Sequence, residues 1–264
     1  MPDAAALSPA EAVTIGVGAA RAAAAILLDR FRGPPAGVRS KSSQTDLVSD
    51  ADDRAEAAVV AFIVGRRPED GLIAEEGSVR EGRSGIRWLV DPLDGTINYL
   101  YGQPHWCVSI AAADELGAIA GVVYDPSRDE LFTAARGDGA RLAGRSLAVS
   151  PVTDPAMALV ATGFSYDAAE RSGQAAIAAR LAGSVRDLRR AGSAALDLAW
   201  VAAGRLDAYF EVSRSPWDSA AGELLVREAG GAVTWTDHRE IVASGPGVHT
   251  ALLALLRASH ESPG

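Results

Sequence analysis

The pattern of apolar and polar residues predicts two helices at the start of the chain. The sequence SPAE at 8–11 supplies a hydroxyl cap, a proline in the first turn and an acid three residues after the cap, which is a helix-start signature. This helix is expected to run to about Phe31 and to stop at the Gly-Pro-Pro that follows. A second helix is predicted from Ser49 or Asp50, because apolar residues at 55, 58, 59, 62 and 63 form one stripe.

Asp52 stands out in the first turn of this second helix. It lies three residues before Ala55 and seven before Val59, so its side chain follows the buried stripe. The ordinary explanation is a favourable interaction with the helix dipole, worth ~0.3–1 kcal/mol at a surface position. We expect the Asp52 side chain to point inward instead, where a buried carboxylate needs hydrogen-bond or charge partners.

The middle of the chain has the pattern of β-strands. The segments 71–77 and 86–90 are predicted to be short strands that end in acidic residues, Glu75 and Glu76 after the first and Asp91 after the second. Three further strands follow, joined by Gly, Asp and Pro turns like consecutive antiparallel strands, at 106–113, 118–125 and 130–135.

The second half alternates between strand and helix patterns. Strands are predicted at 158–164, 185–189 and 207–212, and helices around 175–182, 193–204 and 216–231. Such alternation favours an α/β layer, whereas the first half reads as helices followed by a meander. We therefore expect an N-terminal α+β subdomain at 1–147 and a C-terminal α/β subdomain at 148–264.

Composition and charge narrow the function classes. The 264 residues carry a net charge of -9, which argues against a broad basic face that grips nucleic acid. The single cysteine, Cys107, is expected to be a buried small apolar residue and fits a reducing cytoplasm. No secretory signal is evident, and the apolar run at 22–28 is too short to span a bilayer. We expect a soluble cytoplasmic protein without a membrane partner.

The stretch DPLDGTINY at 91–99 carries candidate chemistry. Asp91 and Asp94 stand at a strand end, where a turn stiffened by proline can aim both carboxylates into one small volume, with the Leu93 carbonyl between them. A hard cation such as Mg²⁺ prefers such oxygen ligands, and the backbone N–H groups of Gly95 and Thr96 can face an anion. An Asp-Pro turn followed by an Asp-Gly turn explains the same residues without a ligand.

Three other acids favour a site. Glu75 ends a strand, Asp52 faces inward, and Asp218 lies in the first turn of a predicted helix. Each has an ordinary structural explanation, but carboxylates that converge on one cavity repel one another unless cations hold them. Phosphate-binding GxxxxGK and nucleophile GxSxG motifs are absent from the sequence. The four histidines lack ligand spacing: His105 is expected to be structural, and the later three to lie at the surface.

Two long motifs, WLVDPLDGTINY and PWDSAAGELLVREAGG, place Asp91 and Asp218 127 positions apart. With these motifs the chain resembles the inositol monophosphatase family of Mg²⁺-dependent, lithium-sensitive phosphatases. The likeness continues through KSSQTDLVSDAD, LIAEEGS and RRAGSAALDLAWVAAGRLDAYFE, so it covers nearly the whole sequence. The resemblance implies a layered αβαβα sandwich of the sugar-phosphatase type and a homodimer.

The resemblance also implies residue roles. Two or three Mg²⁺ ions would be bound by Glu75, Asp91, the Leu93 carbonyl, Asp94 and Asp218. The catalytic residues would be Glu75, Thr96 and Asp52, with Thr96 positioning and deprotonating the attacking water. The substrate would contact Gly95, Thr96, Gly192, Ser193, Ala194 and Glu211, and Lys41 would lie on a loop near the weaker metal site.

The substrate is less well specified than the reaction. Inositol monophosphate is the first expectation, because DGTINY is closer to the inositol phosphatase form than to that of nucleotide 3'-phosphatases. Histidinol phosphate, fructose 1,6-bisphosphate and a nucleotide 3'-phosphate are alternatives, and Arg214 is as well placed for solvent as for substrate. A non-enzymatic alternative is a regulatory interaction protein, since some bacterial relatives bind transcription machinery. The complete set of acids favours an enzyme.

Overall fold

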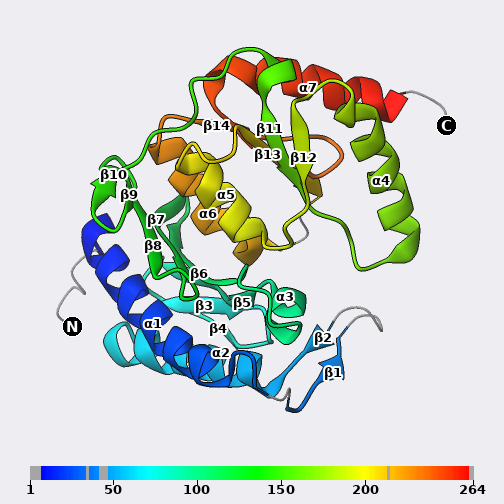
Figure 1. The fold of residues 1–264 in the computed structure, drawn as a ribbon. Helices are drawn as coiled ribbons and strands as arrows, with labels where there is room; N and C mark the ends of the chain where they lie inside the picture. Colours follow the sequence, from blue (N-terminus) through cyan, green and yellow to red (C-terminus); the bar gives the residue numbers. More distant parts are fainter. Residues whose placement is uncertain (1–6, 34–35, 42–46, 213–214, 262–264) are drawn as a thin grey trace.

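The computed structural model describes residues 7–33, 36–41, 47–212 and 215–261, which form two large sheets between layers of helices (Figure 1). The layers follow the order α1 (Pro9–Arg30) with α2 (Asp50–Arg66), the first sheet, α5 (Ala194–Ala202) with α6 (Pro216–Glu228), the second sheet, and α4 (Ala168–Ala182) with α7 (Pro246–Glu261). This arrangement confirms the αβαβα sandwich that the sequence motifs implied.

The first sheet has eight strands in the order β10-β9-β8-β7-β6-β5-β3-β4. Their bounds are β3 (Gly71–Ala74), β4 (Val79–Arg80), β5 (Arg87–Asp94), β6 (Cys107–Asp114), β7 (Gly117–Asp125), β8 (Glu130–Ala135), β9 (Gly139–Leu142) and β10 (Arg145–Ser146). From β5 to β8 neighbouring strands are antiparallel, which confirms the predicted meander, and β9 and β10 continue it in the same way. A two-stranded ribbon of β1 (Arg39–Ser40) and β2 (Leu47–Val48) and the short α3 (Thr96–Leu100) lie beside it.

The second sheet has five strands in the order β12-β11-β13-β15-β14. It contains β11 (Leu159–Thr162), β12 (Asp187–Arg189), β13 (Ala208–Val212), β14 (Ala232–Trp235) and β15 (Glu240–Ser244), and a 3₁₀ turn, η1 (Pro155–Met157), precedes it. The predicted strands β11, β12 and β13 are parallel, as an α/β alternation requires. The hairpin of β14 and β15 and the helix α7, which the sequence pattern did not predict, add antiparallel strands and the last outer helix.

Three apolar cores fill the spaces between these layers in the described part of the chain. The central core lies between the two sheets and contains the fully buried Cys107, as predicted for this residue. Helix α6 belongs to the second half of the sequence but packs on β6, β7 and β8 of the first sheet. The subdomain boundary between residues 147 and 148 therefore stays a prediction.

The two predicted helix starts form as expected. Ser8 Oγ accepts a hydrogen bond from the Glu11 backbone N–H at 3.2 Å, and α1 ends at Arg30. At α2, Asp52 Oδ2 accepts from the Ser49 backbone N–H at 3.0 Å, which completes a capping box. This reciprocal cap turns the Asp52 side chain inward, where it is completely buried.

Helix α1 is, by length and composition, the one described helix that could cross a membrane. The apolar run at 22–28 is too short by itself, but it is part of a helix of 22 residues that contains an 18-residue window with a mean hydropathy of 1.6. Its buried face packs on α2 and on β6 and β7 of the first sheet. The apolar character of α1 is therefore explained by its packing in the first apolar core.

One of the three late histidines, His249, does not lie at the surface as expected. His249 is buried, with Nε2 2.8 Å from Thr234 Oγ1 and Nδ1 2.9 Å from Ser244 Oγ. The prediction failed because β14 and β15, which supply these partners, were not predicted. His260 pairs with Glu240 at 2.9 Å, and His105 packs edge-on against a tryptophan of α5, so both have structural contacts.

Candidate active site

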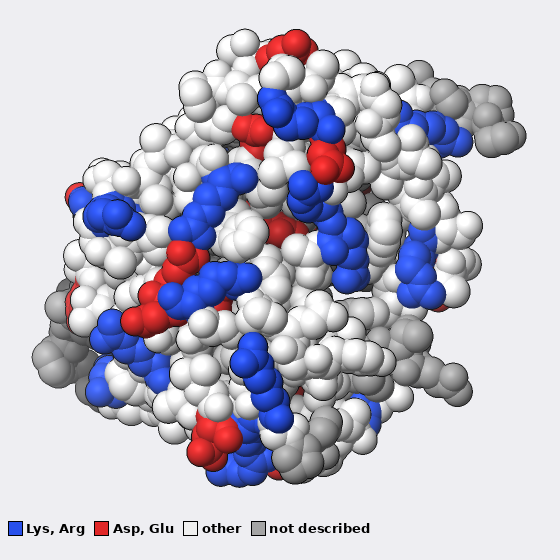
Figure 2. Space-filling view, in the orientation of Figure 1, with Lys and Arg blue, Asp and Glu red and all other residues white. Residues whose placement is uncertain are grey.

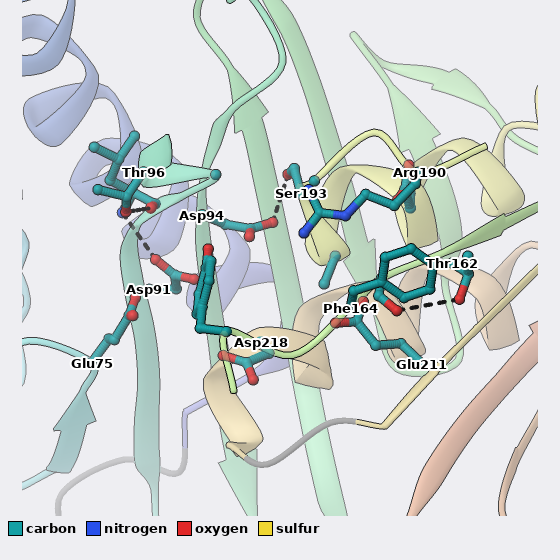
Figure 3. A pocket seen from close by; sticks show the side chains of 17 residues that line it. Glu75, Asp91, Asp94, Thr96, Thr162, Phe164, Arg190, Ser193, Glu211 and Asp218 are labelled. Carbon is teal, nitrogen blue, oxygen red and sulfur yellow. Dashed lines mark hydrogen bonds between the residues drawn. The ribbon is translucent and has the colours of Figure 1, made fainter. Parts of the chain in front are cut away.

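A cavity of about 140 Å³ opens where the first sheet meets α5, α6 and the strand β13. Every predicted site residue except Asp52 lines it, although these residues come from segments far apart in the sequence. Figure 3 shows Glu75, Asp91 and Asp94 on one side of the view and Thr162, Phe164, Arg190 and Glu211 on the other. The structure therefore gathers the predicted residues, while their roles stay predictions.

A β-bulge places Asp91 and Asp94. Strand β5 pairs Asp91 with Ser109 and Asp94 with Cys107, so β5 has one more residue than its partner β6 in this interval. Such a bulge bends a strand and changes the direction of its side chains. Pro92 lies in the bulge, and Asp91 Oδ1 accepts a hydrogen bond from the Leu93 N–H at 3.0 Å. Both carboxylates consequently reach the cavity from one strand end.

Asp94 also joins the two halves of the chain. Its Oδ2 accepts hydrogen bonds from Ser193 Oγ at 2.6 Å and from the Ala195 N–H at 2.8 Å. Ser193 is the N-cap of α5, and the first amides of a helix favour a carboxylate. Burial nevertheless raises the pKa of Asp94 to about 6, because it outweighs these two hydrogen bonds.

Thr96 and Asp52 form a buried hydroxyl–carboxylate pair. Thr96 Oγ1 lies 3.1 Å from Asp52 Oδ1 and 3.0 Å from the Leu93 carbonyl oxygen. A hydroxyl has one proton, and an ionised carboxylate is the stronger of these two acceptors. Ser49 Oγ donates to the other Asp52 oxygen at 2.6 Å and fixes the carboxylate. When Thr96 donates to Asp52, its lone pairs remain available to accept a hydrogen bond from water in the cavity.

Glu75 enters the cavity from the turn after β3. Its Oε1 accepts from Lys41 Nζ at 2.9 Å, and the same ammonium group is 2.7 Å from Glu76 Oε1. Glu56 of α2 holds this turn by accepting from the backbone N–H groups of Glu76 and Ser78 at 2.7 and 2.9 Å. Lys41 therefore lies beside Glu75 and Glu76, and its place near a metal ion stays a prediction.

Asp218, in the first turn of α6, completes the acidic side of the cavity. Burial, and then the charges of Glu75 and Asp94, raise the pKa of Asp218 to about 8. Burial and the charge of Glu75 likewise raise the pKa of Asp91 well above its ordinary value. The ionised forms of these carboxyls repel one another, and a cation bound among them would reduce this repulsion.

The donor set fits a hard divalent cation. It consists of carboxylates and a backbone carbonyl, which are ligands that Mg²⁺ accepts, usually together with water and substrate phosphate. Within the described ranges, however, no three acidic, histidine or cysteine side chains already lie close enough to enclose one metal ion. Hydrogen bonds to Ser193 and the ion pair with Lys41 occupy oxygens of Asp94 and Glu75 instead. Metal binding would thus draw these side chains together.

Two glycines shape the cavity wall. Gly95 has a φ of 94°, and a Cβ there would lie 2.9 Å from the His105 carbonyl oxygen. Gly192 has a φ of 91° and contacts Asn98, whose Nδ2 donates to the carbonyls of His105 at 2.7 Å and Ala191 at 2.9 Å. Asn98 thereby ties α3 to the segment that precedes α5, so the cavity keeps its width.

Glu211 forms part of the opposite wall, together with residues that the sequence did not single out. Tyr209 Oη donates to Glu211 Oε2 at 2.5 Å, and the carboxylate packs so closely on Gly163 that a Cβ there would lie 1.8 Å from that oxygen. Burial raises the pKa of Glu211 to about 7. Thr162 and Phe164 follow from the parallel pairing of β11 with β13, which no local pattern indicates.

The cavity contains one cation among its described lining residues, Arg190, from the segment after β12. The sequence pointed to Arg214 instead, which lies outside the described residues. On the face drawn in Figure 2, basic side chains are scattered and several lie beside acidic ones. Ion pairs in the described part of the chain include Arg189 with Asp187, Arg205 with Glu130 and Arg128 with Asp125.

A layered sandwich with an acid-lined cavity at the end of a bulged strand is the architecture of a metal-dependent sugar phosphatase. Residues 8–261 match the model of the inositol monophosphatase family. Nus factor SuhB of Escherichia coli strain K12 is 42% identical over 254 residues, which cover 93% of this chain and 95% of that protein. The chain therefore belongs to the inositol monophosphatase family, whose members are generally Mg²⁺-dependent.

Solved structures agree with this assignment. The crystal structure of the extragenic suppressor protein suhB from Bartonella henselae is 37% identical, with a TM-score of 0.87 over 95% of this chain and 98% of that one. The inositol monophosphatase structure from Anabaena is 36% identical, with a TM-score of 0.82 over 95% and 96% of the two chains. The fold and family are thus shared with proteins named both as phosphatases and as SuhB.

Proposed function

We propose that the protein is a Mg²⁺-dependent phosphomonoesterase that hydrolyses inositol monophosphate to inositol and phosphate. The observation that carries this proposal is the convergence of Asp91, Asp94 and Asp218 on one cavity beside the Thr96–Asp52 pair. Bound Mg²⁺ would lower the pKa of a water, neutralise phosphate charge and stabilise the leaving alkoxide. Glu75, Asp91, the Leu93 carbonyl, Asp94 and Asp218 are the groups that would hold it.

The protein's own residues position the attacking water. Thr96 donates a hydrogen bond to Asp52, so Oγ1 can accept a hydrogen bond from the attacking water and orient the water oxygen toward phosphorus. The backbone amides of Gly95 and Thr96, at the start of α3, are candidates to bind phosphate oxygens. In the net reaction the water oxygen bonds to phosphorus, the ester P–O bond breaks, and the released alkoxide takes up a proton.

The direct test is phosphate release from a panel of esters, with and without Mg²⁺ and lithium. The panel contains inositol 1-phosphate, histidinol phosphate, 3'-phosphoadenosine 5'-phosphate and fructose 1,6-bisphosphate. We expect Mg²⁺-dependent, lithium-sensitive release that is fastest from inositol 1-phosphate. Faster release from another ester would replace the substrate, and release from none would overturn the enzymatic function.

Two variants separate the metal-site role of Asp94 from general effects of losing a charge. Asp94→Asn keeps the shape and an oxygen that Ser193 can bond, but removes the charge, so we expect turnover to fall about 1,000-fold in a folded protein. Asp138→Asn is the matched control, because the Asp138 side chain is 72% exposed and far from the cavity lining. Near wild-type turnover of Asp94→Asn would contradict the metal assignment.

A second candidate function comes from the name of the relatives. Nus factor SuhB, at 42% identity, is named as a transcription factor, which favours a protein contact with transcription machinery. The net charge of -9 argues against direct nucleic-acid binding. We expect RNA polymerase to co-purify with both the wild type and Asp94→Asn, which would support this role independently of catalysis. Co-purification with neither protein would contradict it.

Two further expectations remain proposals. A homodimer follows from family membership, and sedimentation should then give about twice the chain mass of 27.2 kDa. A cytoplasmic location follows from the single buried cysteine, and fractionation of cells that express the protein tests it.

A further inference from the structure

Arg190 brings a positive charge to the wall of the cavity that also contains Ser193 and Glu211. It follows β12 directly, and a Cβ on Gly192 would lie 2.8 Å from Arg190 Nη1, so the guanidinium rests against the Gly192 backbone. In Figure 3 the side chain extends toward the part of the cavity where Ser193 and Asp94 lie. The residue is exposed to solvent and also lines the cavity, so it stands at the rim.

The guanidinium keeps its donors free for a ligand. The neighbouring Arg189 is paired with Asp187 at 2.5 Å. Arg190, in contrast, forms no hydrogen bond or ion pair with another residue in the described ranges. Glu211 and Asp197 feel its charge only through space, since Arg190 lowers the pKa of both carboxyls against the larger effect of burial. An unpaired arginine beside two carboxylates is a strong donor next to strong acceptors.

The cavity wall near Arg190 contains groups of both charge signs. Arg190 contributes one positive charge, while Glu211 and Asp197 contribute carboxyls that are largely buried. A second phosphate on the substrate would face both carboxyls, and an ammonium group would face the arginine. A hydroxyl has neither problem, because it accepts from a guanidinium and donates to a carboxylate.

We propose that Arg190 is a specificity-determining residue that donates hydrogen bonds to hydroxyl oxygens of the leaving group, so that the site prefers the monophosphate of a neutral polyol. The inference rests on the proposed phosphatase function and adds to it the residue that recognises the alcohol. A Cβ at residue 192 would lie 2.8 Å from Arg190 Nη1 and would shift the guanidinium, while the φ of 91° itself favours glycine there.

The test compares Arg190→Gln with the matched control Arg189→Gln on two substrates. Inositol 1-phosphate carries hydroxyls, whereas p-nitrophenyl phosphate presents an aryl group with none. Loss of a hydrogen bond from a charged donor at an exposed rim should raise the KM for inositol 1-phosphate about 10-fold, with kcat within about twofold because the contact is made equally in ground and transition states. The KM for p-nitrophenyl phosphate should change by less than about twofold.

A binding measurement adds a readout that a purely structural role would not move. Free inositol should inhibit hydrolysis of p-nitrophenyl phosphate by the wild type and Arg189→Gln, and about 10-fold more weakly in Arg190→Gln. Arg190→Lys, which keeps the charge but loses the planar fork, should fall between them.

The outcomes separate the two proposals. Equal loss on both substrates, or unchanged kinetics with inositol 1-phosphate, would overturn the role of Arg190 while leaving the phosphatase intact. A wild type that hydrolyses neither ester with Mg²⁺ would overturn the proposed function and the inference together. Thermal unfolding of each variant shows whether an equal loss comes from misfolding. If Arg190→Gln is misfolded, the same comparison of the two substrates is made with Arg190→Lys.

Discussion

Replacing Thr96 with valine tests how the cavity activates water. Valine has nearly the shape of threonine, so the substitution removes the hydroxyl whose Oγ1 lies 3.1 Å from Asp52 Oδ1 and 3.0 Å from the Leu93 carbonyl. General acid–base groups contribute about 10²–10⁴-fold to a rate, and we expect turnover to fall within this range. Because the residue is 8% exposed, solvent does not replace the lost group easily.

The same substitution has a smaller effect on stability. Asp52 keeps its hydrogen bonds from Ser49, at 3.0 Å from N and 2.6 Å from Oγ, and loses one of its three donors. A buried polar group that loses a partner costs about 1–3 kcal/mol, which corresponds to a fall in Tm of roughly 2–10 °C for a chain of this size.

The assay is phosphate release under saturating Mg²⁺, with Thr96→Ser as the matched control. Serine restores the hydroxyl and should recover turnover to within about tenfold of the wild type. A valine variant that is folded and turns over within about twofold of the wild type would refute the role of this hydroxyl.

Two further predictions concern the surroundings of the site. Lys41→Gln removes the ammonium group that lies 2.9 Å from Glu75 and 2.7 Å from Glu76. Because this group competes with the metal for Glu75, the Mg²⁺ concentration for half-maximal turnover should fall. An unchanged or higher value would show that Lys41 does not compete with the metal. Burial lowers the pKa of His249, so the unfolded chain binds more protons below the ordinary imidazole pKa of about 6.5, and stability is lost as pH falls below this value. His249→Gln should therefore lose less in Tm between pH 7 and pH 5 than the wild type, and an equal loss would contradict this linkage.

Local patterns predicted much of the fold because helix caps and strand alternation are local. The helix starts at Ser8 and Ser49 and the meander from β5 to β8 were confirmed, whereas β9 and β10 were not predicted. The hairpin of β14 and β15 was not predicted. Its strands are held by pairing with β13, which is distant in sequence. Such pairing also buries His249, contrary to its predicted surface position.

The acidic side of the site was accessible from the sequence because its residues stand at element ends. Asp52 follows a capping serine, and Asp91 and Asp94 end a strand. The opposite wall could not be predicted, because Thr162 at the end of β11 and Phe164 in the segment after it reach the cavity only through the tertiary pairing of β11 with β13. Arg190 has no distinguishing local signal beside Arg189, and only the three-dimensional arrangement separates their roles.

The central claim is that the acidic cavity binds Mg²⁺, and calorimetric titration tests it without reference to any substrate. We predict saturable Mg²⁺ binding by the wild type and by the exposed-site control Asp138→Asn. Asp218→Asn removes a buried carboxyl whose pKa is raised to about 8 by burial and by the neighbouring acids, and binding should weaken by at least about tenfold. A wild type that does not bind Mg²⁺, or an Asp218→Asn variant that binds it as tightly as the wild type, would contradict the account.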